Sequence, residues 1–469
     1  MAPCEWHDHK VNFIDTPGYN EFHGEVRAAL RACDGMLMVL SATTGVETDT
    51  VRAWEYAVEL QMPRMAFINK MDVDGADFFG TIERMRELFG KAIMPLQIPI
   101  GEGANFEGVI DVAKMTAFTY KDGQPTEIAV PAHLIEKAQE IREMTVEAAA
   151  EGSDELLEKY LEGEELSLEE IRQGLREGMI TGRVCPIMCG SATSRIGLDQ
   201  VLDRMIRYMP DAAKKVMTAE SADTGEPVGE HGDKPLTAFV FKTLLDPFAG
   251  KQSFVRIFSG ELKEGDKLFN VNQGTEEKWN KMVTLIGKQQ IPVTAAKAGD
   301  IVVIPKLANA KTGDTLTAPD FKVKYDAIRF PQPLYTVAME AVKKGEEEKL
   351  ASAVLKVAEE DPTCVVVKNP EARQLQIDCM GEVHLEHILN KMDRKYGVQA
   401  KLVTPYIPYR ETIKGSAETE SKYKKQSGGH GQYGHVKIQV DPLYDGSEFA
   451  FVDKIFGGAV PKQYIPAVE

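Results

Sequence analysis

The sequence lacks the features that mark membrane, secreted and disulfide-stabilised proteins. It has no run of about 18 apolar residues, so it predicts no membrane-spanning helix. Its first residues, Met-Ala-Pro-Cys-Glu-Trp, have neither a basic region nor a long apolar stretch and do not form a signal peptide. The six cysteines include no Cys-x-x-Cys pair, which argues against a zinc ribbon or a disulfide framework. We therefore expect a cytoplasmic protein with buried thiols.

Positive charge is also scarce, because 72 acidic residues outnumber 55 basic residues and the formal net charge is −17. An acidic chain does not bind nucleic acid over its whole surface, so any contact with RNA must be local. The chain has 469 residues, of which 43% are hydrophobic and 27% are charged. This composition is typical of a globular protein, and the length predicts about three or more domains.

The first 212 residues alternate apolar strands with helices. Strands are predicted at 11–15, 35–40, 65–68 and 184–188, and helices at 21–33, 49–60 and 198–208. Fully apolar strands separated by helices predict a parallel sheet that is covered on both faces. Residues about 95–180 interrupt this pattern, and their Glu, Ala and Leu content from about residue 130 predicts a helical insertion.

The rest of the chain is divided into segments with different sequence patterns. A polar linker is predicted at 213–234, and short strands with Gly turns predict a β-barrel at 235–322. The order βαββαβ at 330–406 predicts a ferredoxin-like domain. Residues 407–469 begin a further α+β domain, which we expect to be truncated. The fold class is therefore a multidomain α/β and α+β protein.

Asp15-Thr16-Pro17-Gly18 follows the first predicted strand. An aspartate at a strand end followed by a flexible glycine turn is typical of a GTPase that senses the terminal phosphate of its nucleotide. Asp15 would reach Mg²⁺, usually through water, and Gly18 would offer its N–H to the γ-phosphate. The alternative is an ordinary turn from strand to helix, and four residues do not decide between the two.

Two further motifs follow later strands, Asn69-Lys70-Met71-Asp72 and Gly190-Ser191-Ala192. Asp72 could accept both adjacent donors of guanine, which adenine lacks, and Asn69 could bind the far edge of the base. The stem of Lys70 could lie over the ring, and the small residues Ser191 and Ala192 could let backbone N–H groups approach the base oxygen. Ligands of α/β sheets bind at the carboxyl ends of strands, so we expect all three motifs at one edge of one sheet.

Taken with their order, these motifs make the chain resemble elongation factor G, a GTPase of translation. The resemblance extends to four further segments, namely 25–31, 361–363, 381–386 and Gln426-Ser-Gly-Gly-His-Gly-Gln-Tyr-Gly-His-Val436. It implies binding of GTP or GDP with Mg²⁺, and action on the ribosome and its rRNA, tRNA and mRNA as a monomer. The implied activity is GTP hydrolysis coupled to movement of tRNA and mRNA.

The sequence departs from this family in its phosphate-binding loop. The pattern G-x-x-x-x-G-K-[ST] is absent, and none of the three Gly-Lys pairs is followed by Ser or Thr. The α/β domain is therefore an incomplete P-loop GTPase domain, and the sequence as given does not account for hydrolysis. We expect a fragment of a longer protein whose Met1 is an artificial or misassigned start. Without the missing strand, residues 11–15 and 35–40 are expected to share no neighbouring strand.

A second departure is Tyr19, since the family usually has histidine after this glycine turn. Tyr19 makes the chain similar to a divergent elongation factor G-like subgroup. A phenol can hydrogen-bond the attacking water but cannot take up its proton as an imidazole can. Tyr19 and Gly18 are therefore the candidate catalytic residues. The alternative is a loop tyrosine that packs on a neighbour.

Basic and aromatic residues alternate around a Gly-rich loop near the end of the chain. This pattern suits contact with RNA backbone and stacked bases, and a solvated basic loop is the alternative. The candidate RNA-contacting residues are Lys424, Lys425, His430, Gln432 and His435. A second His-rich segment, His384-x-x-His387 with Glu382 and Glu386, is expected to be a solvated helix face and not a metal site.

Two other functions remain compatible with the sequence. A non-catalytic paralogue could still bind the ribosome through its later domains. A ribosomal protection protein would share the motifs of the first domain, although the long Gly- and His-rich segment at 426–436 favours the translocase.

Overall fold

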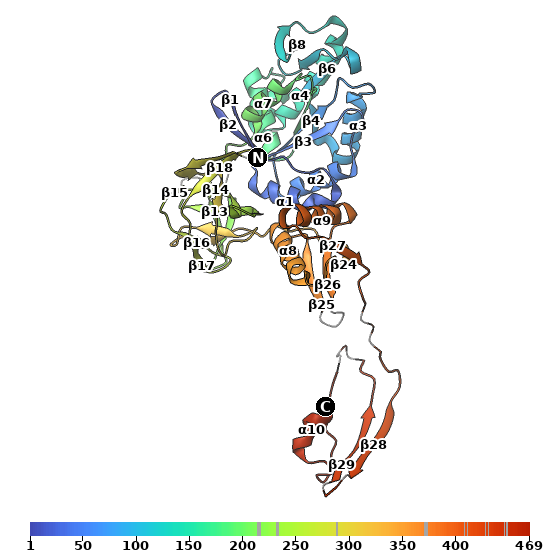
Figure 1. The fold of residues 1–469 in the computed structure, drawn as a ribbon. Helices are drawn as coiled ribbons and strands as arrows, with labels where there is room; N and C mark the ends of the chain where they lie inside the picture. Colours follow the sequence, from blue (N-terminus) through green and yellow to red (C-terminus); the bar gives the residue numbers. More distant parts are fainter. Residues whose placement is uncertain are drawn as a thin grey trace. The chain divides into compact units, whose positions relative to one another are not determined.

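A computed structural model describes residues 1–212, 217–230, 234–287, 289–369, 374–407, 409, 411–426, 428–429, 431–444, 446 and 449–469 (Figure 1). The chain forms two compact units, one built from the described residues up to 405 and one from those that follow. None of the helices in the described part of the chain is long and apolar enough to cross a membrane.

A four-stranded parallel sheet is the centre of the first domain, as predicted. Its order is β3-β4-β10-β5, with bounds Met36–Ser41, Arg64–Asn69, Cys185–Cys189 and Ile93–Pro95. Side chains of β4 alternate between two cores: Ala66 and Ile68 face one, and Met65 and Phe67 face the other. This alternation between two buried faces is why the four central residues of β4, 65–68, are all apolar.

Helices cover both faces of this sheet. The helices α2 (Thr48–Glu59) and α3 (Phe78–Phe89) contribute to one core, and α6 (Leu168–Ile180) and α7 (Leu198–Tyr208) contribute to the other. The helix α4 (Ile135–Ala150) contributes residues to both cores. The prediction of an α/β domain is therefore confirmed.

The strand before Asp15 does not belong to this sheet, so that part of the prediction is wrong. The strand β2 (His9–Phe13) pairs antiparallel with β1 (Ala2–Trp6) in a separate two-stranded sheet. Side-chain contacts attach this hairpin of β1 and β2 to α7 and to the second domain. Trp6 Nε1 donates to Asp203 Oδ1 on α7 at 2.8 Å, and Lys10 pairs with Asp300 at 2.9 Å.

The outer strand of the parallel sheet is β3, as expected from the missing neighbour. Among the described residues β3 pairs only with β4, and it shares no neighbouring strand with β2. Val39 on β3 is 58% exposed, so one face of the sheet is partly uncovered at this strand.

The insertion contains a small antiparallel sheet that the sequence did not predict. Its order is β6-β7-β8-β9, with bounds Gln97–Ile100, Gly108–Asp111, Thr116–Lys121 and Gln124–Ile128. These strands are only four to six residues long, and β9 is exposed at every position, so no apolar alternation marks it. The helices α4, α5 (Asp154–Leu161) and α6 follow, as predicted.

The second domain is an eight-stranded antiparallel β-structure, as expected of the predicted barrel. Its strands, in the order of the sheet, are β17 (Thr275–Glu277), β16 (Leu268–Asn270), β22 (Thr315–Thr317), β13 (Thr237–Asp246), β14 (Gly250–Ser259), β21 (Ile301–Pro305), β18 (Met282–Ile286) and β19 (Gln289–Val293). Predicted turns lie at Gly265 and Gly299, which adopt φ values of 94° and 99° that other residues rarely adopt. Arg256 on β14 donates two hydrogen bonds of 2.9 Å to Asp34, which precedes β3.

The third domain has the predicted βαββαβ order. Its elements are β24 (Tyr335–Ala341), α8 (Glu347–Glu360), β25 (Val365–Asn369), β26 (Gln374–Cys379), α9 (Glu382–Tyr396) and β27 (Ala400–Val403). The sheet order is β25-β26-β24-β27 with all neighbours antiparallel, which is the arrangement of a ferredoxin-like domain.

The second unit contains a long hairpin and a short helix. The strands β28 (Ala417–Gln426) and β29 (Gly431–Val440) pair antiparallel over ten residues each. The side chains of both strands are almost all exposed. The helix α10 spans Ile465–Val468.

Candidate functional site

The loops after β4 and β10 begin side by side, because these two strands are parallel neighbours. Asn69 ends β4, and its Oδ1 accepts a hydrogen bond of 2.9 Å from the backbone N–H of Ala192. Two backbone hydrogen bonds reinforce the contact, from Gly190 N–H to Ile68 O at 3.0 Å and from Met71 N–H to Gly190 O at 3.2 Å. The predicted convergence of these two motifs at one sheet edge is therefore present.

Lys70 turns the chain sharply after β4. It adopts φ of +64°, a left-handed conformation that costs a non-glycine residue about 1–2 kcal/mol. The turn leaves Lys70 exposed and places Met71 in the core with no exposed surface. The buried Met71 anchors the loop, so Lys70 and Asp72 on either side of it are held at the surface.

Asp72 is positioned by a residue that the sequence did not single out. Its Oδ2 accepts a hydrogen bond of 3.0 Å from the hydroxyl of Ser194, in the loop after β10. This contact joins the two loops a second time and orients a half-buried carboxylate. The only signal in the sequence that could have indicated Ser194 is its position, a few residues after Ser191.

The turn at Ser191 is a closed structure by itself. The N–H and C=O of Ser191 both bond to Ile196 at 3.0 Å, and Ser191 is 1% exposed. A Cβ on Gly190 would lie 2.2 Å from the carbonyl oxygen of Ile196, so only glycine fits there. The N–H groups of Ser191 and Ala192 already have protein acceptors, so their predicted approach to a base oxygen stays a prediction.

Asp15, Gly18 and Tyr19 lie on a different part of the fold. They follow β2, which is not a strand of the parallel sheet, so the predicted single edge for all motifs is wrong for these residues. Asp15 and Gly18 are exposed, and Tyr19 is 69% exposed at the residue before a 3₁₀ helix, η1 (Asn20–Phe22). Tyr19 is therefore mostly exposed, which argues against the alternative of a loop tyrosine packed on a neighbour.

The segment that follows Tyr19 contacts the third domain at the start of α9. Glu21 Oε2 accepts a hydrogen bond of 2.6 Å from the backbone N–H of His384, in the first turn of α9. A carboxylate at this position satisfies a free N–H group and is attracted to the helix N-terminus. A Cβ on Gly381 would lie 2.4 Å from the Glu21 carboxyl carbon, so the helix start fits closely around this carboxylate.

His384 is buried, which corrects the prediction of a solvated face. Its Nε2 lies 2.8 Å from Asp361 Oδ2, and its Nδ1 accepts from Met380 N–H at 3.1 Å. Burial raises the pKa of Asp361, but hydrogen bonds from His384 and Thr363 outweigh this and hold the pKa at about 2. Both ring nitrogens of His384 are therefore engaged, which leaves none for a metal ion.

The remaining candidate residues lie on the hairpin of the second unit. The register pairs Lys424 with Tyr433, Lys425 with Gln432 and Lys422 with His435. Because side chains alternate between faces, Lys424 and His435 share one face while Lys425 and Gln432 share the other. His435 also pairs with Glu420 at 2.6 Å. His430 lies outside the described residues.

The side chains at the joined loops are of the kinds that could bind a guanine base, which stays a prediction. The edge of the base could be bound by Asp72 and Asn69, and its face could be covered by Lys70. Hydrogen bonds from the loop after β10 fix the positions of Asn69 and Asp72. For Mg²⁺ the candidate site offers one carboxylate, that of Asp15. No cluster of three or more His, Cys, Asp or Glu residues suited to a metal occurs within the ranges that the structure describes.

Comparisons with known families assign the domains of the chain. Residues 1–211 match the family model of the elongation factor Tu GTP binding domain. With the parallel sheet and its two joined loops, this match makes the chain a translational GTPase. The models of elongation factor G domain 2, domain III and domain IV match residues 235–319, 330–404 and 405–469. The chain belongs to the elongation factor G family, which confirms the resemblance inferred from its motifs.

A solved structure supports the same assignment. The crystal structure of a protein from Thermus thermophilus has 34% sequence identity to this chain and a TM-score of 0.86. The similarity covers 100% of this chain and 68% of the other chain. The shared fold therefore extends over all the domains described above.

The contact between Asn69 and Ala192 leads to a prediction for the Asn69→Ala variant. The substitution removes the acceptor of the Ala192 N–H, and such a bond contributes about 0.5–1.5 kcal/mol. We expect hydrogen exchange of the Ala192 amide to become faster by up to about tenfold, as measured by mass spectrometry or NMR. Asn280→Ala, at an exposed position in a loop of the second domain, is the control. Equal exchange in both variants would contradict the contact.

Proposed function

We propose that this protein binds guanine nucleotides through Asn69, Lys70 and Asp72 and acts on the ribosome as a GTP hydrolase coupled to movement of tRNA and mRNA. The observation that carries the proposal is the pair of hydrogen bonds from the loop after β10 to Asn69 and Asp72. Domains matched to elongation factor G follow this site along the chain and support ribosome binding. The protein is proposed to act as a cytoplasmic monomer.

Base selection rests on the Asp72 carboxylate. Guanine presents its N1–H and amino group side by side, and an ionised carboxylate can accept from both. Charge-assisted bonds of this kind are roughly twice as strong as neutral ones, whereas adenine has no matching pair of donors. The hydroxyl of Ser194 holds one carboxylate oxygen at 3.0 Å, which fixes the direction of the group before the base arrives.

The residues after β2 are proposed to respond to the phosphates. Asp15 would bind Mg²⁺ through water, and Gly18, whose Cβ position is open, would offer its N–H to the terminal phosphate. Bound GTP and Mg²⁺ supply the phosphoryl group and neutralise its charge. Tyr19, which is 69% exposed, would orient the attacking water through its hydroxyl.

The test of this function measures GTP hydrolysis with and without ribosomes for the unmodified protein, Tyr19→Phe and Tyr19→His. Because residues 1–469 lack the G-x-x-x-x-G-K-[ST] loop, each protein is prepared in a longer chain that supplies this loop, and we expect ribosomes to stimulate hydrolysis by the chain with Tyr19. Loss of one orienting hydrogen bond predicts roughly a tenfold lower rate in Tyr19→Phe. Tyr19→His should retain activity, because imidazole can orient water and accept a proton.

Each outcome separates one interpretation of the protein from another. Equal rates for Tyr19→Phe and the unmodified protein would remove Tyr19 from the mechanism. Ribosome binding without any GTP turnover would instead identify a non-catalytic ribosome-binding paralogue. Hydrolysis that releases a ribosome-bound inhibitor but moves no tRNA would identify a ribosomal protection protein.

The hairpin of the second unit is proposed to contact RNA. Lys424 and Lys425 are exposed and adjacent, and they point to opposite faces of β28. Substituting each in turn therefore shows which face contacts RNA. Gln432 and His435 on β29, and His430 between the strands, are proposed to contribute hydrogen bonds and stacking. The pairing of His435 with Glu420 leaves the lysines as the main cationic groups near the loop.

The salt dependence of ribosome binding tests these lysines. Each phosphate contact that is lost reduces the slope of log K against log salt concentration by roughly 0.7–0.9. We expect Lys424→Gln or Lys425→Gln to reduce the slope by this amount, depending on which face meets RNA. Lys462→Gln, exposed elsewhere in the same unit, is the control. If neither lysine variant changed the slope, the RNA contact would be wrong.

A further inference from the structure

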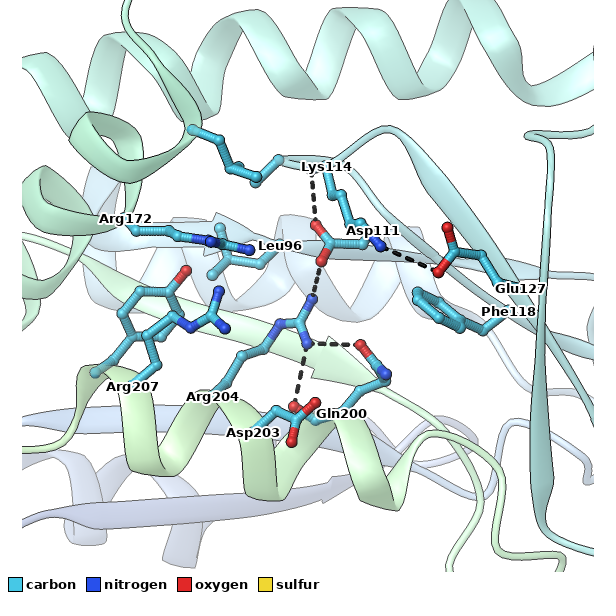
Figure 2. Close-up of a pocket in the computed structure, with 13 residues that line it drawn as sticks. Leu96, Asp111, Lys114, Phe118, Glu127, Arg172, Gln200, Asp203, Arg204 and Arg207 are labelled. Carbon is cyan, nitrogen blue, oxygen red and sulfur yellow. Dashed lines mark hydrogen bonds and ion pairs between the residues drawn. The ribbon is translucent and has the colours of Figure 1, made fainter. Parts of the chain in front are cut away.

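A pocket lies between the insertion and the last helix of the first domain (Figure 2). Its volume is about 240 Å³. Residues of the small antiparallel sheet line one side, including Asp111, Lys114 and Phe118, and residues of α6 and α7 line the other. It is separate from the nucleotide loops, since none of the candidate nucleotide-binding residues lines it.

Three arginines meet in this pocket. Arg172 comes from α6, and Arg204 and Arg207 come from α7. Figure 2 shows the side chains of Arg172 and Arg207 extended on the same side of the pocket as Arg204. All three act on the buried phenol of Tyr208: burial raises the pKa of Tyr208, and their positive charges offset part of that rise. Such a convergence is unexpected in a chain with a net charge of −17.

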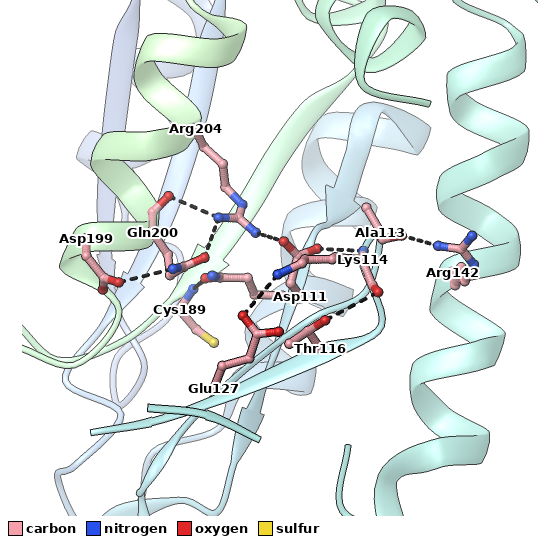
Figure 3. A network of polar contacts seen from close by, with 11 residues as sticks. Asp111, Ala113, Lys114, Thr116, Glu127, Arg142, Cys189, Asp199, Gln200 and Arg204 are labelled. Atoms are coloured by element: carbon pink, nitrogen blue, oxygen red, sulfur yellow. Dashed lines mark hydrogen bonds and ion pairs between the residues drawn. The ribbon is translucent and has the colours of Figure 1, made fainter. Parts of the chain in front are cut away.

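Arg204 is held rigidly but keeps a free donor. It is 6% exposed, donates to Gln200 Oε1 at 2.9 Å and pairs with Asp111 at 2.6 Å (Figure 3). Its Nε is buried and has no hydrogen-bond partner among the residues that the structure describes. A ligand oxygen would satisfy this donor, although it could reach the buried atom only after neighbouring side chains shift.

The carboxylates that line the pocket already have partners. Asp111 binds Arg204 and accepts from Lys114 N–H at 3.0 Å, and Glu127 binds Lys114 Nζ at 3.1 Å (Figure 3). Asp203 accepts from the Trp6 indole, which is a neutral donor, so Asp203 keeps its negative charge. The lining has four cationic side chains, Lys114 and the three arginines, against three carboxylates, so it carries an excess of one positive charge.

The other two arginines retain donors of their own. Arg172 pairs with Glu169 through one nitrogen, which leaves its other N–H groups for a second acceptor. Arg207 is exposed and forms no ion pair within the described part of the chain. Donors from three guanidinium groups are thus available on one side of the pocket.

We propose that this pocket binds a small phosphate monoester. Guanidinium groups match the oxygens of a phosphoryl group, and three of them offer donors from different directions. Leu96 and Phe118 also line the pocket and would contact a short carbon chain attached to the phosphate. The volume lies below the ~300–1,000 Å³ of typical ligand sites, so the ligand is smaller than a nucleotide.

Calorimetric titration with glycerol 3-phosphate, and separately with inorganic phosphate, tests the site at constant ionic strength. We expect one molecule to bind per chain, with the ester bound more tightly than inorganic phosphate. Arg207→Gln should weaken binding by about tenfold, because it removes a charged donor without disturbing the core. Arg176→Gln is the matched control, since Arg176 is exposed on α6 and does not line the pocket.

Three outcomes would overturn the proposal. These are no saturable binding of either probe, equal binding by Arg207→Gln and Arg176→Gln, and binding that chloride at the same ionic strength abolishes. Phosphate bound at the nucleotide loops would be insensitive to Arg207→Gln, so the variant separates the two sites. A thermal shift for each variant without ligand shows whether the fold is intact.

Discussion

The hydrogen bond from Ala192 N–H to Asn69 is the contact on which the candidate nucleotide site depends. It joins the loops that follow two neighbouring parallel strands, so residues 123 positions apart in sequence become one surface. The bond from Ser194 to Asp72 completes the surface. Because the buried Met71 and the close approach of Gly190 to Ile196 both restrict movement, the carboxylate of Asp72 is oriented before any ligand binds.

A second constraint acts between domains of the first unit. The segment directly after Tyr19 supplies a carboxylate to the first turn of α9, and Phe22 packs edge-on against His384 with ring centroids 5.6 Å apart. The conformation of that segment therefore depends on domain III as well as on the domain that carries the nucleotide loops. Since His384 is itself held by Asp361, the junction rests on a connected set of part-buried polar contacts, whose members depend on one another.

Elements with a strong apolar period were predictable from the sequence, and contacts between distant segments were not. The helix α7, the βαββαβ order and the meeting of Asn69 with the Ser191 turn follow from periodicity and from the geometry of parallel sheets. The pairing of β2 with β1 was missed because it is made by hydrogen bonds between backbone groups. The spacing of apolar residues does not show which strand provides those bonds. Ser194, Glu21 and the burial of His384 were missed for a related reason, since each depends on a partner from another loop or domain.

The base preference of the protein and of its Asp72→Asn variant tests the central claim most directly. Xanthine has a carbonyl group where guanine has its amino group, so an asparagine amide can donate to it while an aspartate cannot. Competition between GDP and XDP should show preference for GDP in the unmodified protein and in Asp74→Asn, an exposed neighbour in the same loop. Asp72→Asn should reverse the preference by about tenfold or more. If Asp72→Asn still preferred GDP, or if the unmodified protein did not distinguish GDP from XDP and ADP, the joined loops would not form a guanine site.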